Sequence, residues 1–301
     1  MTTDLPRQTT SYLLRRFREA GIRPRTQLGQ NFLADLNLVE LLVRSADVGP
    51  RDVVLEVGTG AGSVTSLVAP LAAAVVTVEI DGSLYQLAGE ELHRFANVAM
   101  LNTDALAGKH RINPEVLAAV DAAMAAAPDR RFKLVANLPY NVATPVLSNL
   151  LALDRPPETM TATIQKELAD RIVARPGTRD YGALSIWMQS QCQTELVRIL
   201  PPSVFWPRPK VHSAIVQVRF DPALRARISD RTFFHGFIRA MFLHRRKFLR
   251  SQLASAVKGK LEKADVDRIL SEQGLAPDLR AEQLDVDAFL ALSEAVQKAE
   301  H

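Results

Sequence analysis

Short, nearly continuous apolar runs alternate with helical patterns along most of the chain, and no other feature constrains the fold as strongly. Such runs are typical of strands that are covered by helices on both faces. They occur at residues 53–57, 74–79, 98–103 and 132–136, and further strands are expected at residues 160–165, 194–200 and 213–220. The alternation predicts an α/β fold built on a doubly wound sheet.

The strand pattern stops after Asp221, and every later segment has a helical pattern. A length of 301 residues suits one large domain and one smaller one. We therefore expect a sheet-containing domain over residues 1–221 and a small all-helical domain over residues 222–301. An alanine-rich helical segment at residues 110–131 lies between two strands and shows no evident chemistry.

The composition is that of a globular protein. Hydrophobic residues make up 47% and charged residues 23% of the chain, and no apolar run reaches the roughly 18 to 20 residues that span a bilayer. Cys192 is the single cysteine, so it can form neither an internal disulfide nor a cysteine-based metal site by itself. We expect a cytoplasmic protein with no bound metal and no membrane partner.

Positive charge gathers in two places. Residues 1–30 contain six arginines against two acidic residues, a net of +4 that equals the excess of the whole chain. A second basic cluster occupies residues 244–250. Such clusters suit phosphate contacts, although a solvated helix face is an alternative for each cluster alone. The proposed phosphate contacts are Arg15, Arg16, Arg23, Arg25, Arg245, Arg246 and Lys247.

A glycine loop follows the first predicted strand. Gly58, Gly60 and Gly62 have the spacing G-x-G-x-G, which permits a tight turn and lets a ligand approach the backbone. A dinucleotide fingerprint requires glycine at the position of Ser63. The loop therefore disfavours a nicotinamide-dependent oxidoreductase.

Carboxylates follow the next two strands at the same expected edge of the sheet. Glu79 lies about 20 residues beyond the glycine turn, where a carboxylate accepts hydrogen bonds from ribose hydroxyls. Asp104 can accept from an exocyclic amino group such as that of adenine. Each could instead be a helix N-cap or turn residue. Together with the glycine loop they predict a site for an adenosine-containing ligand without a pyrophosphate.

Seven segments of the chain resemble those of the small-subunit rRNA adenine dimethyltransferases, over about residues 26–290. The segments are LGQNFL, LEVGTGAGSVT, VEID, NTDAL, NLPYN, QKELADRIVARPGTRDYGALS and FWPRPKVHSAI. The resemblance implies a class I S-adenosylmethionine-dependent methyltransferase fold, Rossmann-like, with a small all-helical C-terminal domain. It also implies dimethylation of the N6 amines of two adjacent adenines near the 3′ end of small-subunit (16S-type) rRNA, in a pre-ribosomal particle. We expect the protein to act there as a monomer.

The resemblance also assigns roles to residues. Phe205 would stack on the target adenine, and Lys210 would lie beside it near the RNA. For Phe205 and the neighbouring Trp206, packing against the core is the alternative. The expected cofactor contacts, drawn from the resemblance and the glycine loop, are Asn31, Leu33, Gly58, Gly60, Glu79, Asp104 and Asn137.

The residues Asn137, Leu138, Pro139 and Tyr140 end a buried strand, and their chemistry suits methylation of an amine. The Asn137 side-chain oxygen and the Leu138 carbonyl can accept both N–H groups of an adenine amine. Pro139 restricts the turn. Tyr140 offers a ring for base stacking, worth about 1 to 3 kcal/mol. A plain turn followed by a core aromatic is the alternative.

Two other readings remain for the family resemblance. Large-subunit rRNA methyltransferases that confer macrolide resistance have a similar glycine loop and turn, but Leu138 and the YGALS segment look more like the small-subunit enzymes. A non-catalytic RNA-binding factor on the same fold would tend to lose the NLPY residues, which are intact here.

Overall fold

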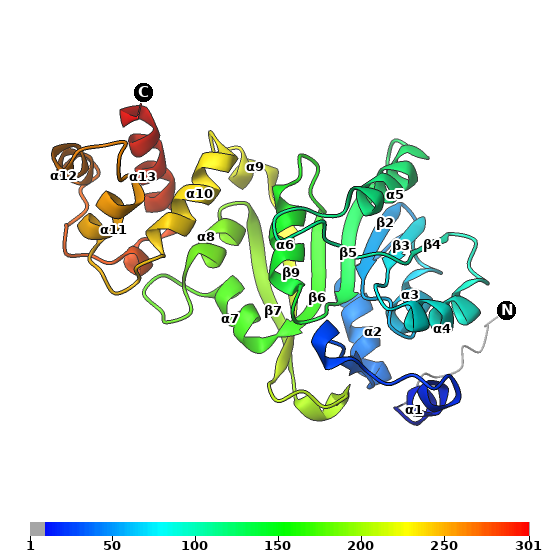
Figure 1. The fold of residues 1–301 in the computed structure, drawn as a ribbon. Coiled ribbons are helices and arrows are strands. Elements are labelled where there is room, and N and C mark those ends of the chain that lie inside the picture. The colour runs from blue at the N-terminus through cyan, green and yellow to red at the C-terminus, as the bar shows by residue number, and fades with distance from the viewer. Residues whose placement is uncertain (1–9, 301) are drawn as a thin grey trace. The chain divides into compact units, whose positions relative to one another are not determined.

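A seven-stranded sheet organises the first part of the chain in the computed structural model, which describes residues 10–300 (Figure 1). The strand order is β4-β3-β2-β5-β6-β9-β7. Every apolar run that predicts a strand forms one, so the doubly wound sheet is confirmed. The bounds are β2 (Asp52–Val57), β3 (Ala74–Val78), β4 (Val98–Leu101), β5 (Arg131–Asn137), β6 (Thr159–Gln165), β7 (Cys192–Leu200) and β9 (Ser213–Phe220).

The strand directions decide which residues meet at one edge. Strands β4, β3, β2, β5 and β6 are mutually parallel, so the residues that follow them lie at the same edge. Strand β9 is antiparallel to β6 and pairs its first residue, Ser213, with the last residue of β6, Gln165. The start of β9 therefore lies at the edge where the parallel strands end. A separate two-stranded sheet pairs β1 (Phe32–Leu33) with β8 (Phe205–Trp206).

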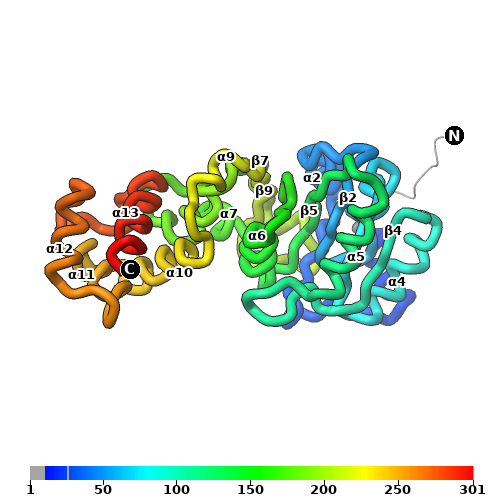
Figure 2. Tube along the Cα trace, turned by 90° about the horizontal axis from the view of Figure 1, so that it is seen from above, coloured from blue at the N-terminus to red at the C-terminus, as the bar shows by residue number. Residues whose placement is uncertain are grey.

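Helices cover both faces of the sheet, and α2 and α5 lie on opposite sides of β2 (Figure 2). Asn113 caps α5 and Pro114 occupies its first turn, which explains where this helix begins. Helix α5 packs against β2 and β3, so the alanine-rich segment is a covering helix of the sheet. The helices of this part are α1 (Thr10–Glu19), α2 (Leu36–Ser45), α3 (Ser63–Val68), α4 (Gly82–Leu92), α5 (Pro114–Ala125) and α6 (Ala143–Ala152).

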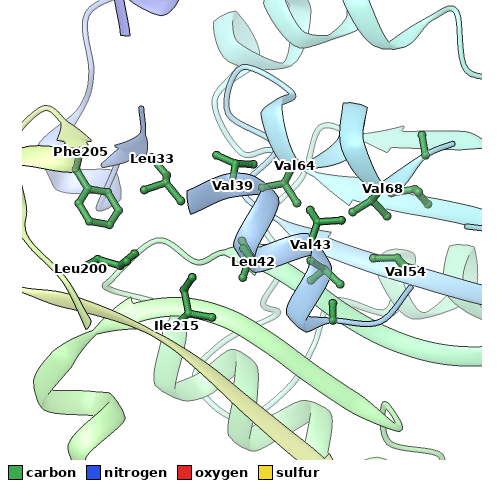
Figure 3. Packing of buried hydrophobic residues seen from close by; sticks show 14 residues of the cluster. Leu33, Val39, Leu42, Val43, Val54, Val64, Val68, Leu200, Phe205 and Ile215 are labelled. Atoms are coloured by element: carbon green, nitrogen blue, oxygen red, sulfur yellow. The ribbon is translucent and has the colours of Figure 1, made fainter. Parts of the chain in front are cut away.

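The core on one face of the sheet is aliphatic. Val39, Leu42 and Val43 share one face of α2 because they are spaced three and four residues apart. They project toward Val54 of β2 and Val64 of α3 (Figure 3). This packing fixes α2 and α3 beside the strand that leads into the glycine loop.

The chain divides into two compact units. The first contains the residues up to Ala169 together with 195–219, and the second contains 170–194 and the residues from Phe220 onward. The second unit confirms the expected helical C-terminal part, and it also includes segment 170–194. A domain boundary at residue 221, with catalysis before it and RNA binding after it, stays a prediction. The remaining helices are α7 (Lys166–Val173), α8 (Ala183–Gln189), α9 (Pro222–Arg225), α10 (Arg231–Met241), α11 (Leu249–Ala256), α12 (Lys263–Glu272) and α13 (Val286–Ala299). Between residues 10 and 300, no helix combines the length and the apolar character needed to cross a membrane.

Leu42→Ala tests the role of α2 in the core. Leu42 is fully buried, so the change should lower the free energy of unfolding by about 2 to 5 kcal/mol through lost burial and a residual cavity. Leu71→Ala is the matched control, since that side chain is exposed, and it should cost no more than about 0.5 kcal/mol. Urea unfolding of both variants measures the difference, and equal costs would contradict the packing described.

Candidate active site

A cavity of about 200 Å³ opens where β2, β3 and β5 end. Its walls come from the glycine loop, the residues after β3 and β4, the turn after β5, and segment 28–32. This is the edge where open α/β sheets bind ligands. Of the seven predicted cofactor contacts, six line this cavity: Asn31, Gly58, Gly60, Glu79, Asp104 and Asn137.

The glycine loop touches the turn that follows β5. Gly58 has a positive φ of 87°, and a Cβ there would lie 3.1 Å from the Pro139 ring. Gly60 has a φ of 57°, and a Cβ there would lie 3.2 Å from the Phe32 ring. Both positions therefore need glycine for conformation and for space. The loop backbone stays open to a ligand in the cavity.

The Glu79 carboxylate is fixed inside the wall of the cavity. Its Oε2 accepts from the Gly60 backbone N–H at 2.9 Å, and its Oε1 accepts from the Asp81 N–H at 2.9 Å. Burial raises the pKa of Glu79, and the backbone hydrogen bonds oppose that rise. A carboxylate held in this way has lone pairs left to accept hydrogen bonds from ligand hydroxyls. Asp81, rather than Glu79, caps α4.

Apolar side chains line the same cavity as the two predicted carboxylates. Asp104 is exposed, and its Oδ1 accepts from the Leu106 N–H at 2.9 Å, as in a turn. Val57, Ile80 and Ala105 also line the cavity, and Ile80 is 49% exposed. Apolar side chains beside a carboxylate suit a flat base with an amino group. The sequence analysis missed Ile80, although its place directly after Glu79 is a usable signal.

Asn137 is the last residue of β5, and only the nitrogen of its side-chain amide has a hydrogen-bond partner. Its Nδ2 donates to the Asn31 backbone carbonyl at 2.8 Å. Its Oδ1 is buried and accepts no hydrogen bond from any described residue. Because the Asn31 carbonyl can only accept, it fixes the amide with the oxygen left for another donor. Buried polar atoms are rarely left without a partner, so this oxygen points to a ligand or substrate.

The rest of the turn is held by nearby strands. The Leu138 N–H donates to the Thr163 carbonyl of β6 at 3.1 Å, and its side chain is buried. The Tyr140 hydroxyl lies 2.5 Å from the Ser213 hydroxyl at the start of β9, and burial raises the pKa of this phenol. Tyr140 does not line the cavity described above, so its stacking on a base stays a prediction.

The structure places Leu33 and Phe205 away from this cavity. They pair with each other across β1 and β8, and both are buried in the aliphatic core with Leu200 and Ile215. Leu33 borders a separate recess of about 30 Å³ beside Gly58. A cofactor contact of Leu33 and a base contact of Phe205 therefore stay predictions. Phe205 is 4% exposed, so stacking on a base would require its ring to leave the core.

Several of the predicted phosphate contacts already have partners. Arg16 pairs with Glu90 at 2.8 Å, and Arg15 lies 3.9 Å from Glu19. Arg25 lies 3.5 Å from Asp81, and Arg245 donates to the Thr178 carbonyl. Arg7 of the N-terminal cluster lies outside the described residues. Of the predicted phosphate contacts, four are exposed and form no ion pair within residues 10–300: Arg23, Lys210, Arg246 and Lys247.

A buried carboxyl below the glycine loop escaped the sequence analysis. Glu56 in β2 accepts from the hydroxyls of Thr65 and Thr77, the latter at 2.6 Å. Burial raises the pKa of Glu56 to about 7, and the two threonine hydrogen bonds oppose the rise. The signal in the sequence is one acidic residue inside the apolar run at residues 53–57.

Glu56→Gln tests this pKa through stability. In the unfolded chain the group has a pKa near 4.5, so the folded state binds the proton more tightly. Its contribution to stability is complete below pH 4.5 and is lost as the pH rises through about 7. As the pH rises between these values, the free energy of unfolding of the native protein should fall by up to about 3 kcal/mol because of this group, at about 1.4 kcal/mol per pKa unit. Glu56→Gln should lack that loss.

Urea unfolding at pH 5 and pH 8 measures the effect. Glu158→Gln is the control, because Glu158 is exposed, and its two unfolding free energies should follow those of the native protein. A native pH dependence that Glu56→Gln leaves unchanged would contradict the proposed burial of a protonated carboxyl.

Comparison with known proteins identifies the family of the chain. Residues 21–298 match the family described as ribosomal RNA adenine dimethylase. The chain is 39% identical over 282 residues to the ribosomal RNA small subunit methyltransferase A of Lactiplantibacillus plantarum, covering 93% of this chain and 92% of that protein. It is 37% identical over 278 residues to the protein of the same name from Bacillus mycoides, covering 92% of each.

Two solved structures share the fold. A dimethyladenosine transferase from Plasmodium falciparum superposes with a TM-score of 0.74 and 22% identity, covering 89% of this chain and 98% of that one. The 23S rRNA methyltransferase ErmE superposes with a TM-score of 0.60 and 23% identity, covering 88% and 99%. Both confirm the expected class I methyltransferase fold. The match over residues 21–298 and the identity to full-length relatives show that the chain belongs to the ribosomal RNA adenine dimethylase family.

Proposed function

We propose that the protein dimethylates the N6 amines of two adjacent adenines near the 3′ end of small-subunit rRNA, using S-adenosylmethionine, within a pre-ribosomal particle. Family membership and the small-subunit name of its relatives support this activity. The observation that carries it is the unpartnered Oδ1 of Asn137, buried beside a cavity suited to an adenosine-containing ligand.

The residues of the cavity fit S-adenosylmethionine. The Glu79 carboxylate would accept from the ribose hydroxyls, and Asp104 would accept from the amino group of the adenine. Ile80 and Ala105 would pack against the base, and the backbone at Gly58 and Gly60 would border the rest of the ligand. When bound, the cofactor supplies a methyl group activated by a positively charged sulfur.

The protein's own contribution is to position and polarise the target amine. The lone pair of an adenine N6 amine is conjugated with the ring, which makes the nitrogen a poor nucleophile. Two acceptors, the Asn137 side-chain oxygen and the Leu138 carbonyl, would hold both N–H groups and favour a pyramidal nitrogen. This preorganised arrangement stabilises charge as it develops on the amine. A strongly basic side chain is not required, because the N6 proton becomes acidic once the methylated nitrogen carries positive charge and can then pass to solvent water.

The two alternatives receive less support. The relatives named above are small-subunit enzymes, whereas the likeness to ErmE is at 23% identity and shows the fold alone. A non-catalytic RNA-binding factor would have no use for an amide oxygen held unpartnered at the cavity. We also propose that the enzyme acts as a monomer in the cytoplasm.

Asn137→Ala removes the proposed acceptor. By analogy with the loss of one oxyanion-hole donor, turnover should fall by roughly 100-fold or more. Single-turnover transfer of labelled methyl groups to unmethylated small subunits measures this, with mapping of the modified bases. Asn149→Ala is the matched control, since that amide lies on α6 and makes one exposed contact with the Lys109 carbonyl. A less stable but fully active Asn137→Ala enzyme would sink the catalytic role.

Salt dependence tests the basic residues. Arg246→Ala and Lys247→Ala should each lower the salt slope of binding to the particle by about 0.7 to 0.9, the value for one lost phosphate contact. Arg16→Ala should change the slope less, because Arg16 already pairs with Glu90. Binding measured between 50 and 300 mM salt, a range of about sixfold chosen to resolve such slopes, gives the comparison. A slope unaffected by Arg246→Ala and Lys247→Ala would refute these two contacts.

A further inference from the structure

One buried residue joins the helix after β3 to the carboxylate of the cavity. Asp81 is 4% exposed, and its Oδ1 caps α4 by accepting from the Ser83 N–H at 3.0 Å. Its own backbone N–H donates to Glu79 Oε1 at 2.9 Å. The position of Glu79 is therefore tied to that of Asp81.

The second oxygen of Asp81 reaches the N-terminal segment. Asp81 Oδ2 accepts from Gln30 Nε2 at 3.3 Å and lies 3.5 Å from Arg25 Nε. Gln30 is 8% exposed, and its Oε1 accepts from the Arg25 backbone N–H at 2.6 Å. Both ends of the Gln30 amide are used, so the side chain cannot turn without leaving buried groups unpaired.

Gln30 directly precedes the residue that orients the candidate catalytic amide. The Asn31 carbonyl accepts from Asn137 Nδ2 and leaves Asn137 Oδ1 unpartnered. The backbone here lies against the turn after β5, since a Cβ at Gly29 would lie 3.1 Å from the Tyr140 backbone nitrogen. A continuous set of contacts thus runs from Glu79 through Asp81 and Gln30 to Asn137.

We propose that Gln30 and Asp81 are positioning residues for methyl transfer, and this rests on the proposed role of Asn137. Their buried hydrogen bond holds segment 29–32 against the cavity. The held segment closes one wall of the cofactor site and presents the Asn31 carbonyl that orients the Asn137 amide. One contact therefore sets both cofactor affinity and the geometry of the acceptor for the target amine.

A reciprocal exchange of donor and acceptor tests this contact. Gln30→Glu places a second carboxylate against the Asp81 carboxylate. Asp81→Asn can place the new amide N–H₂ against the N–H₂ of Gln30, while the remaining oxygen at position 81 still caps α4. The double variant Q30E/D81N restores one donor and one acceptor with the wild-type net charge. Glu90→Gln is the control, because it removes one exposed charge from the same helix α4.

Three measurements report on different parts of the proposal. Calorimetry gives the dissociation constant of S-adenosylmethionine, and single-turnover methylation at saturating cofactor gives the rate. Trypsin cleavage after Arg25 reports how firmly the segment is held. Each single variant should bind cofactor about tenfold more weakly, the scale of one buried hydrogen bond left unmade. Each should also transfer methyl groups about tenfold more slowly and be cleaved faster, and the double variant should recover most of all three.

The outcomes separate this proposal from the proposed function and from a purely structural role. A simple loss of helix capping would lower thermal stability but leave the rate at saturating cofactor unchanged, and that result overturns the proposal. Single variants that behave like the wild type, or a double variant no better than either single one, also overturn it. If a single variant does not fold, Gln30→Met, which keeps the volume and loses the hydrogen bond, must show the same two losses. Full activity of Asn137→Ala would instead refute the catalytic role of Asn137, and a wild-type protein that transfers no methyl group to small subunits would refute the proposed function.

Discussion

The site depends on the close approach of two turns at the ends of neighbouring parallel strands. β2 and β5 lie side by side, so the loop after β2 and the turn after β5 meet, and a Cβ at Gly58 would lie only 3.1 Å from the Pro139 ring. A ligand that follows the glycine loop is thereby brought next to Asn137. The sheet itself therefore brings together the two turns that border the proposed cofactor site and the proposed acceptor.

The sequence was most informative where the signal is local. Strands leave short apolar runs in the sequence, so all seven strands of the large sheet could be located. Gly58, Glu79 and Asn137 each follow such a run, and the common edge of parallel strands places them around one cavity. Their proximity follows from strand order and direction alone, so it can be predicted without knowing how the side chains pack.

The sequence was least informative where contacts join distant residues. The Asn31 carbonyl and Asn137 are 106 positions apart, and Gln30 and Asp81 are 51 apart. No periodicity marks such pairs. The same limit applies to charge: Arg16 and Arg25 look like free cations in the sequence, but Glu90 and Asp81 lie beside them in the fold. Phe205 shows a third case, since an aromatic in a proline-rich loop can pack into a core.

The direction of β9 has a consequence for how the chain tolerates length changes. Because β9 is antiparallel to β6, the residues that precede it reach the cavity-bearing edge, and Phe220 ends it at the opposite one. A deletion between Pro207 and His212 would shorten the approach to Ser213, which holds the Tyr140 hydroxyl. An insertion just after Phe220 would lie at the far end of β9, one strand length away from the contact between Ser213 and Tyr140. Insertions and deletions are therefore expected to concentrate after Phe220 and to avoid residues 207–212, which precede β9 in the sequence.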